Sequence, residues 1–203
     1  MGTLFLVRHC ATEASSDGRY CGRLDLSLTR EGQAQAQVLA AFLVERRPTS
    51  LFSSPLKRAK QTAKPLAKVG RLTVQEIDDM AEMAFGQWEG LTGDEMKDRD
   101  AELYERWRNA PQAVSPPEGE TVSDVAERSR RVLEHIRKTD PDGVSVAVGH
   151  KTFNRILISV LEELPLEGYR RSVPQPVGAI NIIEWSGTGV PSVRGVGLTG
   201  HFG

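Results

Sequence analysis

The sequence predicts an α/β fold, a three-layer sandwich with a mostly parallel central sheet and helices on both faces. Short apolar runs of strand length, such as residues 3–7 and 144–148, end directly in polar residues, which is typical of strands buried on both faces of a parallel sheet. Longer segments between them carry apolar residues at three- and four-residue steps, as amphipathic helices do. Alternating strands and helices favour this layered architecture.

Length and composition predict one domain, residues 1–203, of the ordinary globular class. With 203 residues, 39% hydrophobic residues and a net charge of -1, the chain can bury its own core and has no overall attraction to nucleic acid or to an anionic membrane. The apolar run before Arg8 is too short for a signal peptide or a membrane span. Cys10 and Cys21 lack the spacing of metal ligands, so we expect reduced thiols and no zinc site. These features predict a cytoplasmic protein.

A strand followed by a capped helix opens the fold. Residues 3–7 form the expected strand, and Thr29 can cap a helix that runs to about Arg46 before Pro48 stops it. The apolar stripe expected to face the sheet consists of Val38, Leu39, Phe42 and Leu43.

A second strand, a helix and a third strand follow. Residues 50–53 predict a short strand, after which Ser54 and Pro55 are expected as the N-cap and first position of a helix. Pro65 should kink or end that helix, because proline lacks the backbone N–H that a helix interior uses. Residues 72–77 predict the third strand.

The middle of the chain predicts less regular structure. Residues 78–93 have the glycine and acidic content of a loop. Residues 94–117 are expected to form an insertion over the sheet: helix formers continue to Arg108, and three prolines then enforce an irregular crossing.

The last part of the chain returns to the strand and helix pattern. Thr121 should cap a helix whose buried stripe is Val122, Val125, Ser129, Val132 and Ile136. A strand at 144–148 leads into a helix through about Leu161. Residues 179–185 and 190–196 flank two glycines and predict a hairpin at the edge of the sheet.

Polar side chains follow three of these strands. Arg8 and His9 come directly after the first strand, Arg58 lies one turn into the helix after the second, and His150 follows the fourth. Because ligands of parallel α/β sheets bind beyond the carboxyl ends of the strands, we expect these side chains to converge on one crevice.

Two guanidinium groups and two imidazoles in one crevice favour a multiply charged anion, and phosphate fits best. The helix that begins after His150 should add N-terminal N–H groups to the same site. A neutral imidazole such as that of His9 is a competent nucleophile when its other nitrogen donates to a backbone carbonyl.

The chain resembles the histidine phosphatase superfamily, in its phosphoglycerate mutase-like branch. The resemblance rests on five segments that occur in the family's order, and together they span the chain. These segments are residues 6–13 with the Arg8-His9 motif, 22–32, 53–63, 82–90 and 148–150.

The resemblance implies a role for five residues. His9 would be the phosphorylated nucleophile, Glu82 the general acid, and Arg8, Arg58 and His150 a clamp around the phosphate. No metal and no cofactor are implied, since positioning and charge compensation dominate phosphoryl transfer. Asp78, Asp79 and Glu89 stay open as alternative acids.

Four further positions are expected to contact the substrate: Ser15, Cys21, Gly22 and Lys151. Ser15 stands where relatives often have an asparagine that reaches the phosphate, and Lys151 stands where a small residue is commoner, so it favours an acidic leaving group. Cys10 replaces the usual glycine of the motif. If it borders the pocket among cations, its thiol pKa should be lowered.

The resemblance predicts a phosphatase of a small soluble phosphomonoester, and two alternatives stay open. A phosphoglycerate mutase is disfavoured by the short 94–117 region, although Arg106 and Arg108 approach the paired arginines of mutases. A non-catalytic phospho-ligand binding module is disfavoured because all five groups are present. The natural substrate and the oligomeric state stay open, with a homodimer as one candidate.

Other phosphate chemistries lack their signatures. A cysteine-dependent phosphatase needs an arginine six residues after its cysteine, and those positions hold Ser16 and Ser27. An Asp-x-Asp motif after an early strand is absent, and so is the Gly-x-x-x-x-Gly-Lys-Ser/Thr signature of nucleotide-binding loops.

Overall fold

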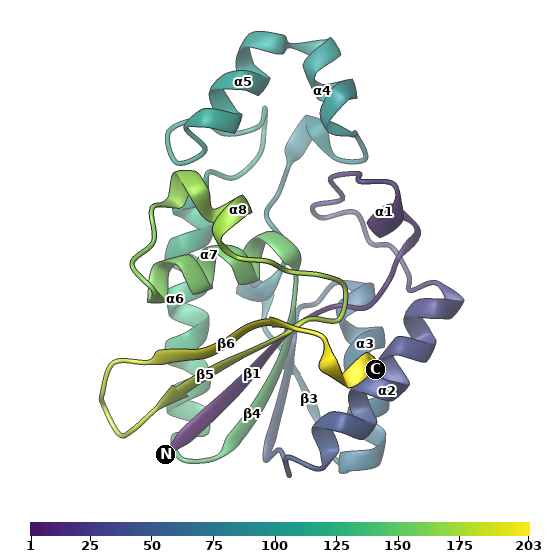
Figure 1. Ribbon diagram of the computed structural model, residues 1–203, viewed down its shortest axis with the longest axis vertical. Helices are drawn as coiled ribbons and strands as arrows, with labels where there is room; N and C mark the ends of the chain where they lie inside the picture. The colour runs from purple at the N-terminus through teal and green to yellow at the C-terminus, as the bar shows by residue number, and fades with distance from the viewer.

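A six-stranded mixed sheet forms the centre of the molecule (Figure 1). The computed structural model describes residues 1–203, with Ser16 described in its backbone only. The strands lie in the order β3-β2-β4-β1-β5-β6. The first four run parallel to one another, β5 runs antiparallel to β1, and β6 runs antiparallel to β5. Their bounds are β1 Gly2–Arg8, β2 Ser50–Ser53, β3 Val74–Glu76, β4 Val144–Gly149, β5 Ile180–Trp185 and β6 Ser192–Leu198. The predicted α/β class and the C-terminal hairpin are confirmed.

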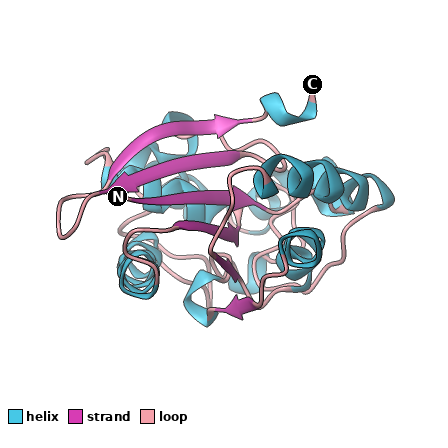
Figure 2. Ribbon diagram, turned by 90° about the horizontal axis from the view of Figure 1, so that it is seen from below, coloured by secondary structure: helices cyan, strands magenta, loops and turns pink.

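Helices cover both faces of this sheet (Figure 2). They are α1 Glu13–Ser16, α2 Arg30–Val44, α3 Lys57–Gly70, α4 Gly93–Arg99, α5 Ala101–Asn109, α6 Val122–Thr139, α7 Lys151–Leu161 and α8 Tyr169–Ser172. Alternate residues of β1 serve the two layers: Phe5 and Val7 pack with α2 and α3, whereas Leu4 and Leu6 pack with α6 and α7. Within the described residues, no helix is both long and apolar enough to cross a membrane.

The caps predicted for two long helices are confirmed. The hydroxyl of Thr29 accepts a hydrogen bond from the N–H of Gly32 at 3.0 Å, and that of Thr121 accepts from Asp124 at 3.1 Å. All five residues of the stripe predicted on α6 are buried. The stripe predicted on α2 is wrong at Val38, which is 44% exposed. Small residues form much of the contact there instead, namely Gly32, Ala36 and Ala40, beside Leu39 and Leu43.

Helix α3 differs from the prediction at its first residue, and Pro65 does not end it. It begins at Lys57, with Leu56 as N-cap, and Ser54 instead accepts from the N–H of Leu56 at 3.3 Å. It also continues past Pro65 to Gly70. Proline removes only one hydrogen bond there, and burial of Leu66 on the sheet holds the last turns in place.

Helices α4 and α5 lie at the top of Figure 1, beyond the ends of the parallel strands. They occupy the segment predicted as an insertion, 94–117, and Asp100 separates them by capping α5 through the N–H of Leu103. Trp107 of α5 is fully buried and packs edge-on against Trp88 with 5.2 Å between ring centroids. Both tryptophans are therefore packing residues of the core.

Candidate active site

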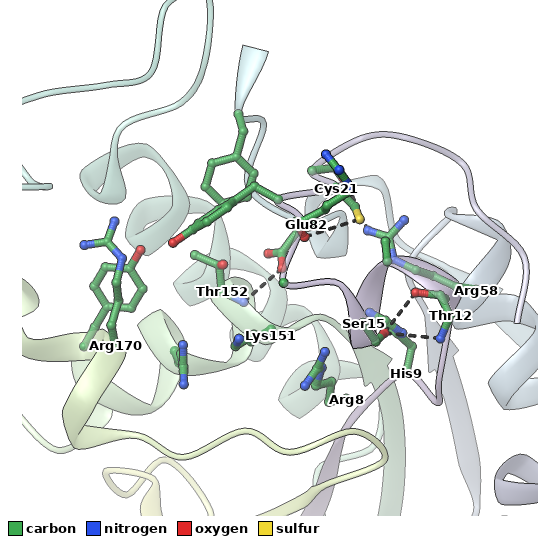
Figure 3. Close-up of a pocket in the computed structure, with 18 residues that line it drawn as sticks. Arg8, His9, Thr12, Ser15, Cys21, Arg58, Glu82, Lys151, Thr152 and Arg170 are labelled. Atoms are coloured by element: carbon green, nitrogen blue, oxygen red, sulfur yellow. Dashed lines mark hydrogen bonds between the residues drawn. The ribbon is translucent and has the colours of Figure 1, made fainter. Parts of the chain in front are cut away.

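The carboxyl ends of the parallel strands meet at a pocket of ≈ 160 Å³ (Figure 3). Its lining includes eight of the nine residues predicted for the site: Arg8, His9, Ser15, Cys21, Gly22, Arg58, Glu82 and Lys151. The ninth, His150, lies behind His9, fully buried, with 5.2 Å between the centroids of the two imidazoles. Residues far apart in the sequence therefore share one site.

The imidazole of His9 is held in one tautomer. Its Nδ1 lies 2.8 Å from the carbonyl oxygen of Cys10. Because a carbonyl only accepts, Nδ1 carries the proton and Nε2 keeps its lone pair. Burial, and then the charges of Arg8 and Arg58, lower the pKa of His9 well below its usual 6.5. The side chain is therefore neutral at physiological pH.

The second imidazole, that of His150, occupies the N-cap position of α7. Its Nε2 lies 2.7 Å from the hydroxyl of Ser54, the residue that follows β2. Burial, followed by the charges of Arg58 and His9, lowers its pKa well below 6.5. Its Nδ1 is buried and has no hydrogen-bond partner in the described part of the chain.

Backbone carbonyls hold the two arginines beside His9. Arg8 donates from Nη1 to Gln175 at 2.7 Å, and Arg58 donates to Leu24 at 2.7 Å and to Gly22 at 2.8 Å. Burial lowers the pKa of Arg8 to about 10 and also lowers that of Arg58, so both stay charged at neutral pH. Carbonyl partners orient these guanidinium groups without neutralising them, and their charge remains for an anionic ligand.

The carboxyl group of Glu82 occupies the N-terminus of α7. Its Oε1 accepts hydrogen bonds from Met83 at 2.9 Å and Phe153 at 3.0 Å, and its Oε2 accepts one from Thr152 at 3.0 Å. The prediction that this helix offers its N–H groups to phosphate is therefore wrong for Thr152 and Phe153. A carboxylate already fills the position that suits an anion.

The alternative acids lie elsewhere. Among the described residues, Glu82 is the only carboxylate that lines the pocket. Asp79 forms an ion pair with Arg131, and the Glu89 carboxylate accepts backbone hydrogen bonds from Arg23 and Phe85. No group of three or more potential metal ligands of the His, Cys, Asp and Glu types occurs in the described part of the chain.

The family follows from a comparison with known proteins: the histidine phosphatase superfamily (branch 1) matches residues 4–197. The chain belongs to this superfamily. A bifunctional protein of Mycobacterium tuberculosis is 35% identical over 98% of this chain, but the chain spans only about half, 54%, of that relative. Phosphoserine phosphatase 1 of Hydrogenobacter thermophilus is 34% identical over 79% of this chain and 76% of its own length.

Solved structures agree with this membership. The phosphoserine phosphatase of Entamoeba histolytica has a TM-score of 0.89 to this chain at 26% identity, with 99% of each chain covered. The fold of a histidine phosphatase is thus shared along the whole length. The resemblance drawn from the five sequence segments is confirmed.

The expectation that Cys10 borders the pocket with a lowered thiol pKa is wrong. Its side chain is fully buried in the layer of α2 and α3, on the far side of the backbone from the pocket. Burial raises its thiol pKa to about 11 instead of lowering it. Strand alternation does not predict this direction, because β1 ends at Arg8 and the consecutive residues Arg8 and His9 both line the pocket.

Ser15, Cys21 and Gly22 line the pocket, and each presents a different group to it. The hydroxyl of Ser15 accepts from the N–H of Thr12 at 3.2 Å and lies 2.9 Å from its hydroxyl, as part of the cap of α1. Burial raises the thiol pKa of Cys21. Gly22 adopts φ +46°, and a Cβ there would overlap the Glu89 carboxylate. Its role in the lining is therefore that of backbone.

Several lining residues were not predicted from the sequence. They are mainly Thr12, Tyr20, Phe85, Thr152, Arg155, Tyr169 and Arg170. Arg155 could have been found, because it lies one helical turn after Lys151 and four-residue spacing places both on one face of α7. Arg170 follows a short turn with no periodic pattern, and only the folded chain shows that it reaches the pocket.

Proposed function

We propose that this chain is a phosphatase that hydrolyses a small phosphomonoester through a phosphohistidine at His9, without a metal or cofactor. The observation that carries the proposal is a neutral imidazole, locked with Nδ1 on the Cys10 carbonyl, beside two arginines that form no ion pair within the described residues. The names of the relatives, two of them phosphoserine phosphatases, support the same class.

In the first step, Nε2 of His9 attacks phosphorus while the bond to the ester oxygen breaks. Glu82 in its protonated form gives its proton to that oxygen, and the alcohol leaves. Its Oε2 accepts only one hydrogen bond from the protein, so a lone pair remains to carry the proton. Arg8 and Arg58 balance the charge on the phosphoryl oxygens, which is the main requirement of a loose transition state, whereas the neutral imidazole of His150 adds no charge and lies behind His9.

In the second step, water attacks the phosphohistidine. The Glu82 carboxylate takes a proton from the water as the new phosphorus–oxygen bond forms and the phosphorus–nitrogen bond breaks. Inorganic phosphate leaves, His9 is neutral again, and Glu82 is protonated for the next cycle. The tautomer set by Cys10 is unchanged throughout, because Nδ1 keeps its proton.

The two alternatives receive less support. Neither Arg106 nor Arg108 lines the pocket, and Arg108 instead donates to the hydroxyl of Tyr104 at 3.3 Å, so the paired arginines of a mutase have no counterpart at the site. A binding module needs no neutral nucleophile or carboxyl group in the same pocket. We place this activity in the cytoplasm, on small phosphorylated metabolites, and a homodimer remains one candidate assembly.

The test is phosphate release from p-nitrophenyl phosphate and a panel of small phosphomonoesters in EDTA. We expect turnover in EDTA, an acid-labile phosphoenzyme, and loss of both in His9→Ala. His135→Ala is the matched control, because this histidine is exposed on α6, outside the pocket. Activity that EDTA abolishes or that His9→Ala retains would overturn the proposal. Efficient interconversion of phosphoglycerates would indicate a mutase, and no turnover at all a binding module.

A further inference from the structure

The pocket holds more positive charge than one phosphate group neutralises. Besides the two arginines at His9, its lining includes Lys151, Arg155 and Arg170. None of these three forms an ion pair within the described part of the chain, whereas Arg19, also in the lining, is paired with Glu95. Three cations thus remain after the reacting phosphate has been matched with Arg8 and Arg58.

These three cations form a continuous row along one side of the pocket. Burial, and then the charges of Arg155 and Arg8, lower the pKa of Lys151, and Arg170 contributes to a lowered pKa of Arg155 that is mainly due to burial. Lys151 and Arg155 lie one helical turn apart on α7, and Arg170 of α8 lines the same pocket. Figure 3 shows Lys151 in the middle of this side and Arg170 at the end away from His9.

The outermost cation is held in place and lacks a partner. The guanidinium of Arg170 lies 3.9 Å from the centroid of the Trp107 ring and 4.7 Å from that of Tyr169. Its Nη2 is buried and forms no hydrogen bond in the described structure. Arg155 donates only from Nε, to the Val173 carbonyl at 2.9 Å. Buried donors of this kind are costly unless a ligand satisfies them.

We propose that the leaving group of the substrate carries its own anionic group, which binds Lys151, Arg155 and Arg170 while the reacting phosphate lies at His9. This inference rests on the proposed phosphatase function. The shared chemistry is a group of anionic oxygens, supplied by a carboxylate or by a second phosphate. A guanidinium binds either through paired N–H donors, and Tyr20 and Tyr169 line the same pocket.

The test compares substrates that differ only in the second anion. O-phosphoserine carries a carboxylate that O-phosphoethanolamine lacks. In the second pair, 3-phosphoglycerate carries a carboxylate where glycerol 3-phosphate has a hydroxymethyl group. Fructose 1,6-bisphosphate and fructose 6-phosphate form the arm for a second phosphate. For one kind of second anion, carboxylate or phosphate, we expect kcat/KM to be at least about tenfold higher for the substrate that carries it. Hydrogen bonds to charged groups contribute a free energy of that size.

A substitution in the row of cations tests whether the row causes the preference for a second anion. The preference is the ratio of kcat/KM for the substrate with the second anion to that for its partner without it. Arg170→Gln should lower this ratio by about tenfold, by raising KM for the substrate with the second anion. Arg170→Lys should lower the ratio less, because it keeps the positive charge. Arg171→Gln is the matched control, because Arg171 is the next residue of α8 but is exposed and outside the lining. It should keep the wild-type ratio.

Two outcomes would overturn the inference. One is an active enzyme with equal kcat/KM for both members of every pair, and the other is an Arg170→Gln variant that loses activity equally on both. If no substrate is turned over, the proposed function fails separately. Calorimetric binding of the same pairs then decides the inference: tighter binding of the anionic members, lost in Arg170→Gln, supports it, and equal Kd values overturn it.

Discussion

The two ends of the pocket hold their cations by different means. At the reacting end, Arg8 comes from the end of β1 and Arg58 from the first turn of α3, and backbone carbonyls fix both guanidinium groups. At the far end, Arg170 comes from the short helix α8 and stacks on the rings of Trp107 and Tyr169, with Nη2 unpaired within the described residues. The reacting end is built on the end of β1 and the start of α3, whereas Arg170 comes from the segment that connects α7 to β5.

This difference separates chemistry from selectivity. Donors that backbone carbonyls hold at fixed positions stabilise a transition state without reorganising, which is where fixed geometry has most effect. Contacts from connecting segments can change without disturbing the sheet, and related folds change their substrates at such positions. We therefore expect substitutions at the reacting end to affect every substrate, and those at the far end to affect only some.

The largest effect that would sharpen this comparison is expected at Glu82, between the two ends. Glu82→Gln removes the proton that the leaving oxygen needs, so kcat for an alkyl phosphomonoester should fall by about 10²–10⁴-fold. With p-nitrophenyl phosphate the leaving group needs no proton, and only the hydrolysis of the phosphohistidine should be slow. Stopped-flow measurement should then show a burst of one p-nitrophenolate per active site.

A matched control for this variant is Glu89→Gln. Its carboxylate also accepts backbone N–H groups, from Arg23 and Phe85, but it does not line the pocket. It should leave both substrates with nearly wild-type kcat. Equal slowing of both substrates by Glu82→Gln, with no burst, would show that Glu82 has a structural role and that another group supplies the proton.

A smaller effect compares arginine with lysine at each end. Arg58 donates to two carbonyls and still faces the pocket, which the single ammonium group of a lysine cannot reproduce because it lacks the planar fork of donors. Arg58→Lys should therefore lower kcat/KM by about 100-fold for every substrate, the weight of two charged hydrogen bonds. Arg170→Lys should lower it by less than about tenfold, and only for the favoured anionic substrate. A larger loss of kcat/KM in Arg170→Lys than in Arg58→Lys, measured by steady-state kinetics, would contradict the comparison.

The reacting end could be predicted from the sequence because its residues follow buried strands. An apolar run such as 144–148 identifies a strand, and parallel strands bring His9, Arg58 and His150 together whatever the length of chain between them. Helix caps such as Thr121 were equally clear, because a cap depends on residues only three positions apart. Local patterns and sheet topology sufficed for these features.

The rest depends on directions and contacts that only tertiary packing sets. Nothing near Cys10 in the sequence shows that its thiol turns into the layer of α2 and α3. Glu82 meets the N-terminus of α7 across about 70 residues, and a rule for helix ends cannot say which anion will bind there. Pro65 is tolerated because the surrounding packing outweighs one missing hydrogen bond.

The two buried imidazoles at the reacting end should make the stability of the protein depend on pH. Burial and nearby arginines lower the pKa of His9 and His150 well below 6.5, so the unfolded chain binds protons at a higher pH than the folded protein. The free energy of unfolding should therefore fall as the pH drops below 6.5, by up to about 1.4 kcal/mol per pH unit for each histidine, until the folded-state pKa is reached.

Urea unfolding at pH 7.5, 6.5 and 5.5 measures this slope. His9→Gln should reduce the slope below pH 6.5 by about half, because one of the two buried imidazoles is gone. His135→Gln, at an exposed position of α6, should leave it unchanged. A free energy of unfolding that stays constant between pH 6.5 and 5.5 would show that the buried imidazoles are not held neutral.

The smallest effect concerns the two thiols, one inside the lining and one beneath it. Cys21 lines the pocket with a pKa raised by burial, and Cys10 is fully buried with a pKa near 11. At pH 7.5, iodoacetamide should therefore modify Cys21 more slowly than free cysteine and should leave Cys10 intact until the protein unfolds, as peptide mass spectrometry can show. Inorganic phosphate should slow the reaction of Cys21 further.

Peroxide should inactivate the wild type and Cys10→Ala at the same rate, because a protonated, inaccessible thiol is a poor target. Faster inactivation of the wild type would mean that Cys10 reaches the pocket after all.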